Sequence, residues 1–330
     1  MSKTALLFAG QGAQVVGMGK DLAEQFPTAK TWFDRANAAL GYDLASICFN
    51  GPESELTKTE NAQPAIFLVS WVAFQLLKER VQSLKSNVES PGTAATLDFG
   101  RGTLDYKATA GLSLGEFTAL TAAGVMSFED GLRIVRQRGK FMQEACDATH
   151  GGMAAVIGLD EAPTREVCRE AGVVLANLNC PGQLVISGEA EKISKAVELA
   201  KAKGAKRAIP LPVAGAYHSP LMAGAQPKLY AELAKLNLSA PSVPVISNVN
   251  AEPHGDPSEI KARLVEQVTS SVIWEKSMRF LLTQGFTRFI ELGPGTALSG
   301  FMKRIDKSAQ MLNVADAASL EATVKAVSAS

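Results

Sequence analysis

Short apolar runs alternate with amphipathic stretches along most of the chain, a pattern typical of an α/β fold. Residues 4–9 (TALLFA) form an apolar run that ends in Gly10-Gln11-Gly12, as expected for a buried strand that enters a tight turn. The same periodicity predicts a strand over residues 107–112 and helices over residues 21–40, 63–81 and 113–124.

Residues 153–213 have a distinct order of apolar and amphipathic segments, which predicts a small lobe inserted into a larger α/β domain. The predicted order there is strand, helix, strand, strand, helix, strand, which is the ferredoxin-like order. The predicted strands are MAAVIGL, VVLANL, QLVISG and RAIPLPV, and the helices begin near Ala162 and Ala190.

Two further segments complete the pattern. Residues 82–106 are rich in Ser, Asn, Gly and Thr with little periodicity, and we expect a long surface loop there. After the lobe, the chain returns through helices, the apolar strands VPVISNV and FTRFIELG, and a polar, Ala-rich tail.

Composition and charge exclude several classes of protein. The 33 Lys and Arg residues balance 33 Asp and Glu residues, which argues against a nucleic-acid binder that relies on bulk positive charge. None of the four cysteines belongs to a C-x-x-C pair, so we expect neither a zinc site nor a disulfide framework. The longest apolar stretch, residues 65–77, is too short to span a bilayer, and the N-terminus does not resemble a signal peptide. We therefore expect a soluble cytoplasmic protein.

One motif points to nucleophilic catalysis. Residues 111–115 read GLSLG, a G-x-S-x-G sequence between a predicted strand and a predicted helix. This is the context of a nucleophile elbow, in which small neighbours let a tight turn expose the serine hydroxyl at a helix N-terminus. Ser113 is the candidate nucleophile, and the N–H of Leu114 is a candidate oxyanion donor. A chance match to so short a motif is the alternative.

A serine nucleophile needs a base, and the chain has three histidines. His150 precedes Gly151-Gly152 at the end of a predicted helix. A positively charged side chain is favourable at a helix C-terminus, so His150 needs no catalytic role to explain its position. His254 lies among Pro, Gly and Asp residues, and we expect it to be solvated in an exposed turn. His218 directly follows an apolar strand, which makes it the best candidate for the base of Ser113.

One charged residue breaks the amphipathic pattern of residues 129–145. Arg133, Arg136 and Lys140 fall on the polar face of this predicted helix, whereas Arg138 falls in the middle of the apolar face. A buried arginine must meet a buried carboxylate or line a pocket. Arg138 is therefore either a structural ion pair or a clamp for a substrate carboxylate.

At these residues the chain resembles the malonyl-CoA:acyl-carrier-protein transacylase family, the acyltransferase domains of fatty acid and polyketide synthesis. The resemblance runs nearly end to end. Its markers, in the family's order, are FAGQGAQ (residues 8–14), NAQPAIF (61–67), GLSLGEF (111–117), RQRGKFMQEA (136–145), NCPGQLVISG (179–188), GAYHSPLM (215–222), VEQVTSSVIWEKS (265–277) and ELGPG (291–295).

The resemblance implies a fold with a discontinuous, α/β-hydrolase-like catalytic domain (residues 1–152 and 214–330) that has a mostly parallel sheet. A ferredoxin-like subdomain (residues 153–213) is inserted into it. It also implies malonyl transfer from malonyl-CoA to holo acyl-carrier protein through a malonyl-Ser113 intermediate, with no cofactor or metal. We expect a cytoplasmic monomer that binds neither nucleic acid nor membrane.

The resemblance also assigns roles to further residues. The backbone N–H groups of Gln11 and Leu114 would bind the oxyanion, and Arg138 would pair with the malonyl carboxylate. The backbone carbonyl of Gln267 would orient His218, with no acidic third member.

The chain departs from the family pattern at three positions. Leu112 replaces a common His, Ala9 a common Pro, and Tyr217 the more usual Phe before the histidine. Since Tyr217 would border the acyl pocket, a polyketide-type acyltransferase that accepts methylmalonyl is one alternative. Two further alternatives do not depend on these departures: a related acyl-thioester hydrolase, which would not need Arg138, and a scaffold that binds carrier protein without catalysis.

Overall fold

The computed structural model describes residues 3–86 and 104–328. Their strands form two separate sheets, one of five strands and one of four. The strands are β1 Lys3–Phe8, β2 Ala108–Gly111, β3 Gly151–Ile157, β4 Val174–Cys180, β5 Gln183–Glu189, β6 Arg207–Pro210, β7 Val245–Ile246, β8 Phe286–Leu292 and β9 Gln310–Val314. The helices are α1 Lys20–Gln25, α2 Pro27–Leu40, α3 Leu44–Asn50, α4 Glu53–Leu56, α5 Thr59–Ser86, α6 Leu114–Ala122, α7 Phe128–Asp147, α8 Glu161–Ala171, α9 Ala190–Ala202, α10 Gln226–Ala234, α11 Pro257–Gln267, α12 Trp274–Thr283, α13 Ala297–Ile305 and α14 Ala317–Ser328, with a short 3-10 helix η1 Pro220–Ala225.

The larger sheet has the order β7-β2-β1-β8-β9, and each neighbouring pair is parallel. Its central strand β1 is buried on both faces, because alternate residues pack into different clusters of the core. Leu6 and Phe8 join the cluster that includes α5, whereas Ala5 and Leu7 join the cluster formed with α12 and α13. Parallel strands covered by helices on both faces explain the continuous apolar run of the N-terminal segment.

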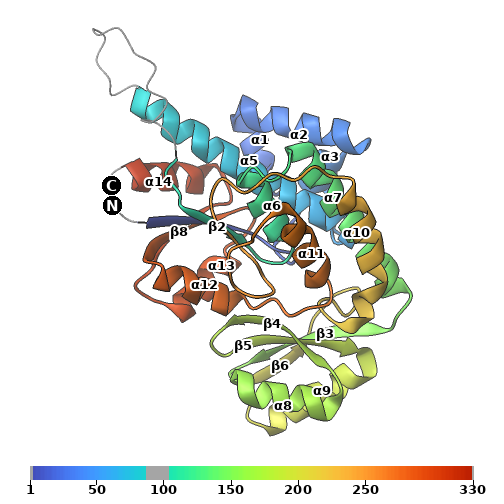
Figure 1. Ribbon diagram of the computed structural model, residues 1–330. Helices are drawn as coiled ribbons and strands as arrows, with labels where there is room; N and C mark the ends of the chain where they lie inside the picture. The colour runs from blue at the N-terminus through green and yellow to red at the C-terminus, as the bar shows by residue number, and fades with distance from the viewer. Residues whose placement is uncertain (1–2, 87–103, 329–330) are drawn as a thin grey trace.

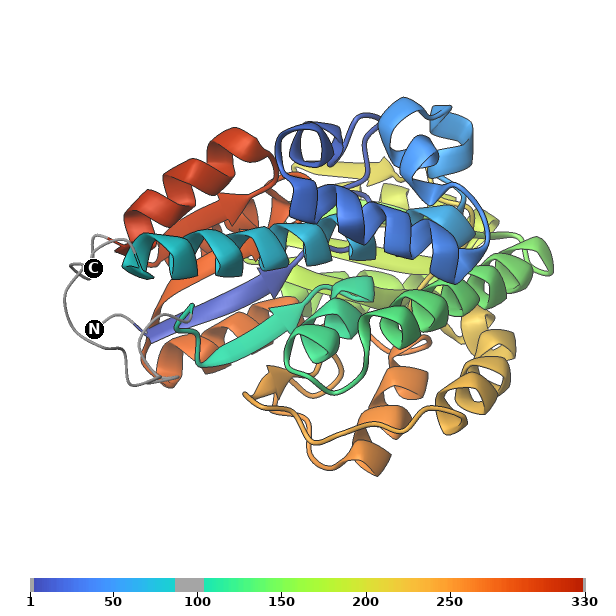
Figure 2. The ribbon, with the colours of Figure 1, turned by 90° about the horizontal axis from the view of Figure 1, so that it is seen from above.

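The helices divide into two layers around this sheet. Figure 1 shows α5 and α14 above the strands and α12 and α13 below them. Seen from above in Figure 2, α5 lies over the face of the sheet that is turned toward the viewer. Helix α7 packs closely on α5, because Gly139 leaves no side chain between them: a Cβ there would lie 2.5 Å from the carbonyl oxygen of Thr59.

The smaller sheet confirms the predicted ferredoxin-like subdomain. Its elements follow the order β3, α8, β4, β5, α9, β6, and its strands pair antiparallel in the order β4-β5-β3-β6. Helices α8 and α9 cover the face of this sheet that points away from the rest of the molecule (Figure 1). The predicted fold class, a mostly parallel α/β domain with this inserted lobe, is therefore confirmed.

Several predicted boundaries are wrong. The helix predicted over residues 21–40 is two helices, because Pro27 begins α2 and cannot continue α1. Residues 82–86 belong to α5 rather than to the predicted loop; residues 87–103 of that loop lie outside the described residues. The apolar segment VPVISNV contributes only the two-residue strand β7. None of the helices in the described residues is both long enough and apolar enough to cross a bilayer.

Candidate active site

Ser113 occupies a strained turn between β2 and α6. Its backbone φ is 53° and ψ is −103°, in a region that residues with a side chain rarely adopt. The two motif glycines make this turn sterically feasible: a Cβ on Gly111 would lie 2.0 Å from the backbone of Gly115, and one on Gly115 would lie 2.2 Å from the carbonyl oxygen of Phe8. The predicted nucleophile elbow is therefore present, and it holds the half-exposed Ser113 at the N-terminus of α6.

The structure brings Ser113 and His218 together. Ser113 Oγ lies 2.8 Å from His218 Nε2, and His218 Nδ1 lies 2.9 Å from the carbonyl oxygen of Gln267. Because a carbonyl oxygen only accepts hydrogen bonds, the proton of the neutral imidazole resides on Nδ1 and Nε2 is free to accept. This is the tautomer that a general base for the serine hydroxyl requires. The histidine is 4% exposed and has a φ of 57°, so packing holds it in an unfavourable backbone conformation.

Burial, followed by the positive charge of Arg138, lowers the pKa of His218 to about 4. The lowered pKa keeps the imidazole in its neutral, proton-accepting form far below pH 6.5. We therefore expect kcat/KM for a reaction that uses this base to stay constant from neutral pH to about pH 5 and to fall as the pH drops through about 4. A pH–rate profile, with circular dichroism to verify folding at each pH, measures this. A half-maximal rate near pH 6.5 would contradict it.

Arg138 is buried, as its position on the apolar face predicts, with 1% of its surface exposed. It donates to Ser113 Oγ (3.0 Å), Gln63 Oε1 (2.7 Å) and Gln267 Oε1 (2.9 Å). Burial lowers its pKa to about 10, which leaves it protonated at neutral pH. Within residues 3–86 and 104–328, no carboxylate lies within 4.0 Å of the guanidinium, so the ion-pair alternative finds no partner there.

The two predicted oxyanion donors lie on the elbow itself and on a turn that packs against it. Leu114 is the first residue of α6, where backbone N–H groups lack partners inside the helix. Gln11 belongs to the turn after β1, and this turn packs on the elbow: a Cβ on Gly10 would lie 2.5 Å from the carbonyl oxygen of Leu112. Among the described residues, neither backbone N–H donates to another group of the chain.

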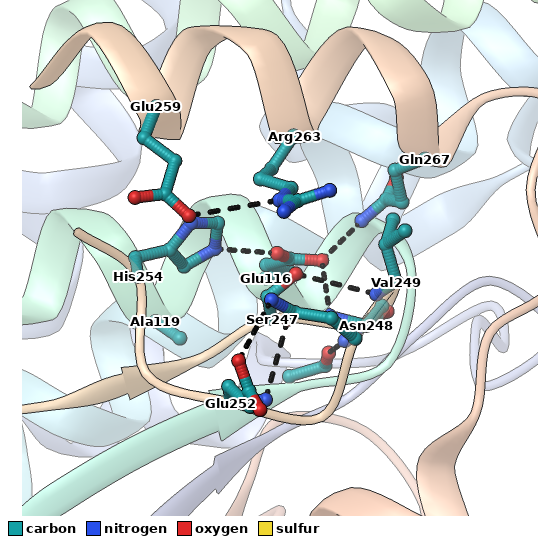
Figure 3. Close-up of polar contacts among 12 residues, drawn as sticks. Glu116, Ala119, Ser247, Asn248, Val249, Glu252, His254, Glu259, Arg263 and Gln267 are labelled. Carbon is teal, nitrogen blue, oxygen red and sulfur yellow. Dashed lines mark hydrogen bonds and ion pairs between the residues drawn. The ribbon is translucent and has the colours of Figure 1, made fainter. Parts of the chain in front are cut away.

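Sequence reasoning missed four polar residues that support these groups. Gln63 receives a hydrogen bond from Arg138, and Asn248 receives one from the backbone N–H of Ser113 at 2.6 Å. Glu116 is fully buried in α6 and accepts a hydrogen bond from His254 at 2.6 Å (Figure 3). Glu116 lies in the apolar sequence LGEFTALTA, so the criterion that singled out Arg138 would also have found it.

The prediction that His254 is a solvated turn residue is wrong. Its side chain is fully buried, because the loop after β7 folds back over α6 and pairs Ile246 with Pro253. The flanking Pro, Gly and Asp residues signalled a turn correctly but gave no information about what packs on it. His150, in contrast, is exposed in the loop after α7.

The site offers hydrogen-bonding groups and a cation rather than a metal centre. Within the described parts of the chain, no cluster of three or more His, Cys, Asp or Glu side chains has the arrangement needed to hold a metal ion. A serine hydroxyl, a neutral imidazole, free backbone N–H groups and an arginine can instead attack a carbonyl carbon, stabilise an oxyanion and bind a carboxylate. This α/β fold and site define a class of enzymes that transfer or hydrolyse acyl groups through a serine.

Comparisons with known proteins narrow this class. The family described as "Acyl transferase domain" matches residues 5–81 and 93–323. The malonyl CoA-acyl carrier protein transacylase of Bacillus subtilis (strain 168) is 44% identical over 330 residues, covering 98% of this chain and 97% of that protein. The chain therefore belongs to the acyl transferase family, among its malonyl CoA-acyl carrier protein transacylases, and is an acyltransferase.

Solved structures agree with this assignment. The acyl-carrier-protein-S-malonyltransferase from Bartonella henselae has a TM-score of 0.89 and 39% identity, covering 99% of each chain. The malonyl-transacylase PlMCAT, solved in complex with the type II PKS acyl-carrier protein AntF, has a TM-score of 0.89 and 37% identity. That match covers 98% of this chain and 100% of the solved one. The family resemblance found in the sequence is thus confirmed.

Proposed function

We propose that this enzyme transfers the malonyl group of malonyl-CoA to the phosphopantetheine thiol of holo acyl-carrier protein, supplying extender units for fatty acid synthesis. The observation that carries the proposal is the position of Arg138. Its buried cation has only neutral partners in the described chain and donates directly to Ser113 Oγ. In a malonyl-serine ester the carboxylate lies two carbons beyond the ester carbonyl carbon, within reach of this guanidinium.

The first half-reaction acylates Ser113. Its Oγ attacks the thioester carbonyl while the hydroxyl proton moves to His218 Nε2, and the backbone carbonyl of Gln267 stabilises the Nδ1–H of the imidazolium. The N–H groups of Gln11 and Leu114 bind the oxyanion. The carbon–sulfur bond then breaks, and the imidazolium returns its proton to the departing CoA thiolate.

The second half-reaction runs the same steps in reverse with a different thiol. His218 removes the proton of the phosphopantetheine thiol, the sulfur attacks the malonyl ester, and the proton returns to Ser113 Oγ as the carbon–oxygen bond breaks. The carboxylate held by Arg138 fixes the acyl group between the two steps. No step requires a cofactor or metal. In this proposal the enzyme is a cytoplasmic monomer. No second subunit then covers Ser113, so a carrier protein can reach it.

Steady-state kinetics with malonyl-CoA and holo carrier protein test this proposal. We expect parallel lines in double-reciprocal plots, because the first product leaves before the second substrate binds. Hydrolysis of malonyl-CoA faster than transfer would identify a thioesterase instead. Absence of both activities would favour the scaffold alternative.

The polyketide alternative depends on Tyr217, which borders the acyl pocket in this proposal. Its hydroxyl lies 2.6 Å from Thr59 Oγ1, so the ring is tied to the start of α5 beside the catalytic histidine. We expect the wild-type enzyme to prefer malonyl-CoA over methylmalonyl-CoA and Tyr217→Ala to reduce this preference roughly 10-fold or more, since one methyl group is worth about 1–3 kcal/mol in a close-fitting pocket. Competition assays measure the ratio. Wild-type enzyme that uses both thioesters equally would favour the polyketide-type acyltransferase.

A further inference from the structure

A buried carboxylate lies behind the candidate site and takes no part in the proposed reaction. Glu116, three residues after the nucleophile, is fully buried in α6. It accepts hydrogen bonds from His254 Nε2 (2.6 Å), Gln267 Nε2 (2.5 Å) and the backbone N–H of Asn248 (3.3 Å). Figure 3 shows these three groups converging on it from α11 and from the loop after β7. All three are donors, which matches a carboxylate and no neutral side chain of the same shape.

The first arm of this network leads to the arginine. Gln267 Oε1 faces Arg138, which can only donate, so the Gln267 amide nitrogen must face the opposite side. That nitrogen donates to Glu116 and to the carbonyl oxygen of Ser113 at 2.9 Å. Glu116 therefore acts together with Arg138 and the Ser113 carbonyl to fix which end of the Gln267 amide meets Arg138, and its contact with that amide is the shortest of the three. A donor in place of the carboxylate would face the Gln267 NH2 group and displace the amide from its position between Arg138 and the Ser113 carbonyl.

The second arm leads to the nucleophile. Asn248 Oδ1 accepts from the backbone N–H of Ser113 at 2.6 Å, and its Nδ2 donates to the carbonyl oxygen of Gly111 at 2.8 Å. These two bonds hold the backbone on either side of Leu112, directly before the strained residue Ser113. Since the backbone N–H of Asn248 donates to Glu116, the carboxylate also anchors the residue that holds the turn.

His254 keeps the carboxylate in place. Its backbone N–H donates to the carbonyl oxygen of Val245, which ties the imidazole to β7. Its Nδ1 is buried and has no hydrogen-bond partner among the described residues. A proton on Nδ1 would be an unsatisfied donor, so the ring carries its proton on Nε2 and donates it to Glu116.

We propose that Glu116 is a positioning residue of the acyl-transfer site and that His254 holds it in place. One carboxylate thereby orients Gln267 toward Arg138 and Asn248 toward the elbow of Ser113. The inference rests on the proposed function, in which Arg138 binds the acyl carboxylate and Ser113 carries the acyl group.

The test compares Glu116→Gln with wild type for kcat/KM on malonyl-CoA and on acetyl-CoA. The amide introduces a donor that clashes with one of the three existing donors. We expect malonyl transfer to fall about 10- to 100-fold, because small displacements of reacting groups have effects of this size. Acetyl transfer should fall less, since it does not use Arg138, so the malonyl-to-acetyl ratio should shift at least about 5-fold.

Glu291→Gln is the matched control. Glu291 is also a buried carboxylate, and it accepts from the backbone N–H groups of Leu298 and Ser299 at the start of α13. Replacing a carboxylate that has only a structural role should lower the melting temperature without changing the malonyl-to-acetyl ratio. That is the result expected for Glu291→Gln. The same result for Glu116→Gln would overturn the inference.

A second pair of variants covers the case in which Glu116→Gln does not fold. His254→Leu removes the donor at similar volume, whereas His254→Gln keeps an N–H donor. We expect the first to shift the malonyl-to-acetyl ratio and the second to restore most of it. Equal ratios in both variants and in wild type would refute the role of His254 in positioning Glu116. Wild-type enzyme that forms no malonyl adduct would instead refute the proposed function.

Discussion

Ser113→Ala should abolish the covalent malonyl-enzyme and reduce transfer to carrier protein by about 10⁴-fold or more, because no other group replaces a lost nucleophile. The alanine removes one hydroxyl, and the hydrogen bond from the Ser113 backbone N–H to Asn248 persists. The fold should therefore be retained. Intact-mass spectrometry and a stopped transfer assay measure the two effects, with circular dichroism to verify the fold.

Ser187→Ala provides the matched control for this variant. Ser187 is a fully buried serine in β5 of the smaller sheet. Its variant should acquire the malonyl adduct as wild type does. Persistent labelling of Ser113→Ala under the same conditions would place the nucleophile elsewhere in the chain.

Arg138→Ala should invert the acyl preference of the enzyme. The malonyl carboxylate would lose its partner in a buried site, which costs about 2–5 kcal/mol and corresponds to a roughly 30- to 5,000-fold loss of malonyl transfer. Uncharged acyl groups would lose no such partner, and they would no longer leave a buried cation unpaired. We therefore expect acetyl transfer to rise relative to malonyl transfer, as measured by competition between the two thioesters.

Arg136→Ala separates this effect from a general loss of an arginine on α7. Arg136 lies two residues earlier on the same helix, and its guanidinium stacks over the ring of Tyr42, 4.8 Å from its centroid. Its variant should keep the wild-type malonyl-to-acetyl ratio. An unchanged ratio in Arg138→Ala would show that Arg138 is structural rather than a substrate clamp.

Local periodicity was sufficient to predict the order of most elements. Buried parallel strands leave continuous apolar runs, and each helix that covers them is amphipathic, so β1, α7 and the helices and strands of the smaller sheet's lobe were predicted close to their observed bounds. The end of α5 was missed because Gln82 and Ser83, which continue the helix, are exposed and add no apolar position to its stripe. The two-residue strand β7 was overestimated, because an apolar sequence does not reveal where its hydrogen-bonding neighbour ends.

The residues of the candidate site also differ in whether the local sequence reveals them. Ser113 could be found because the elbow has a local sequence signature, and Arg138 because it interrupts an apolar helix face. The family resemblance added Gln11 and Gln267, whose backbone groups have no signature of their own. His254 could not be placed, because its burial depends on a partner in α6, 138 residues away in the sequence.

The most direct test of the account is intact-mass spectrometry of the enzyme with equimolar malonyl-CoA, methylmalonyl-CoA and acetyl-CoA, followed by addition of holo carrier protein. We predict a malonyl adduct on Ser113 that forms first and then moves to the carrier. A methylmalonyl or mixed adduct would contradict malonyl selectivity and implicate Tyr217. Free malonic acid without an adduct would contradict acyl transfer itself.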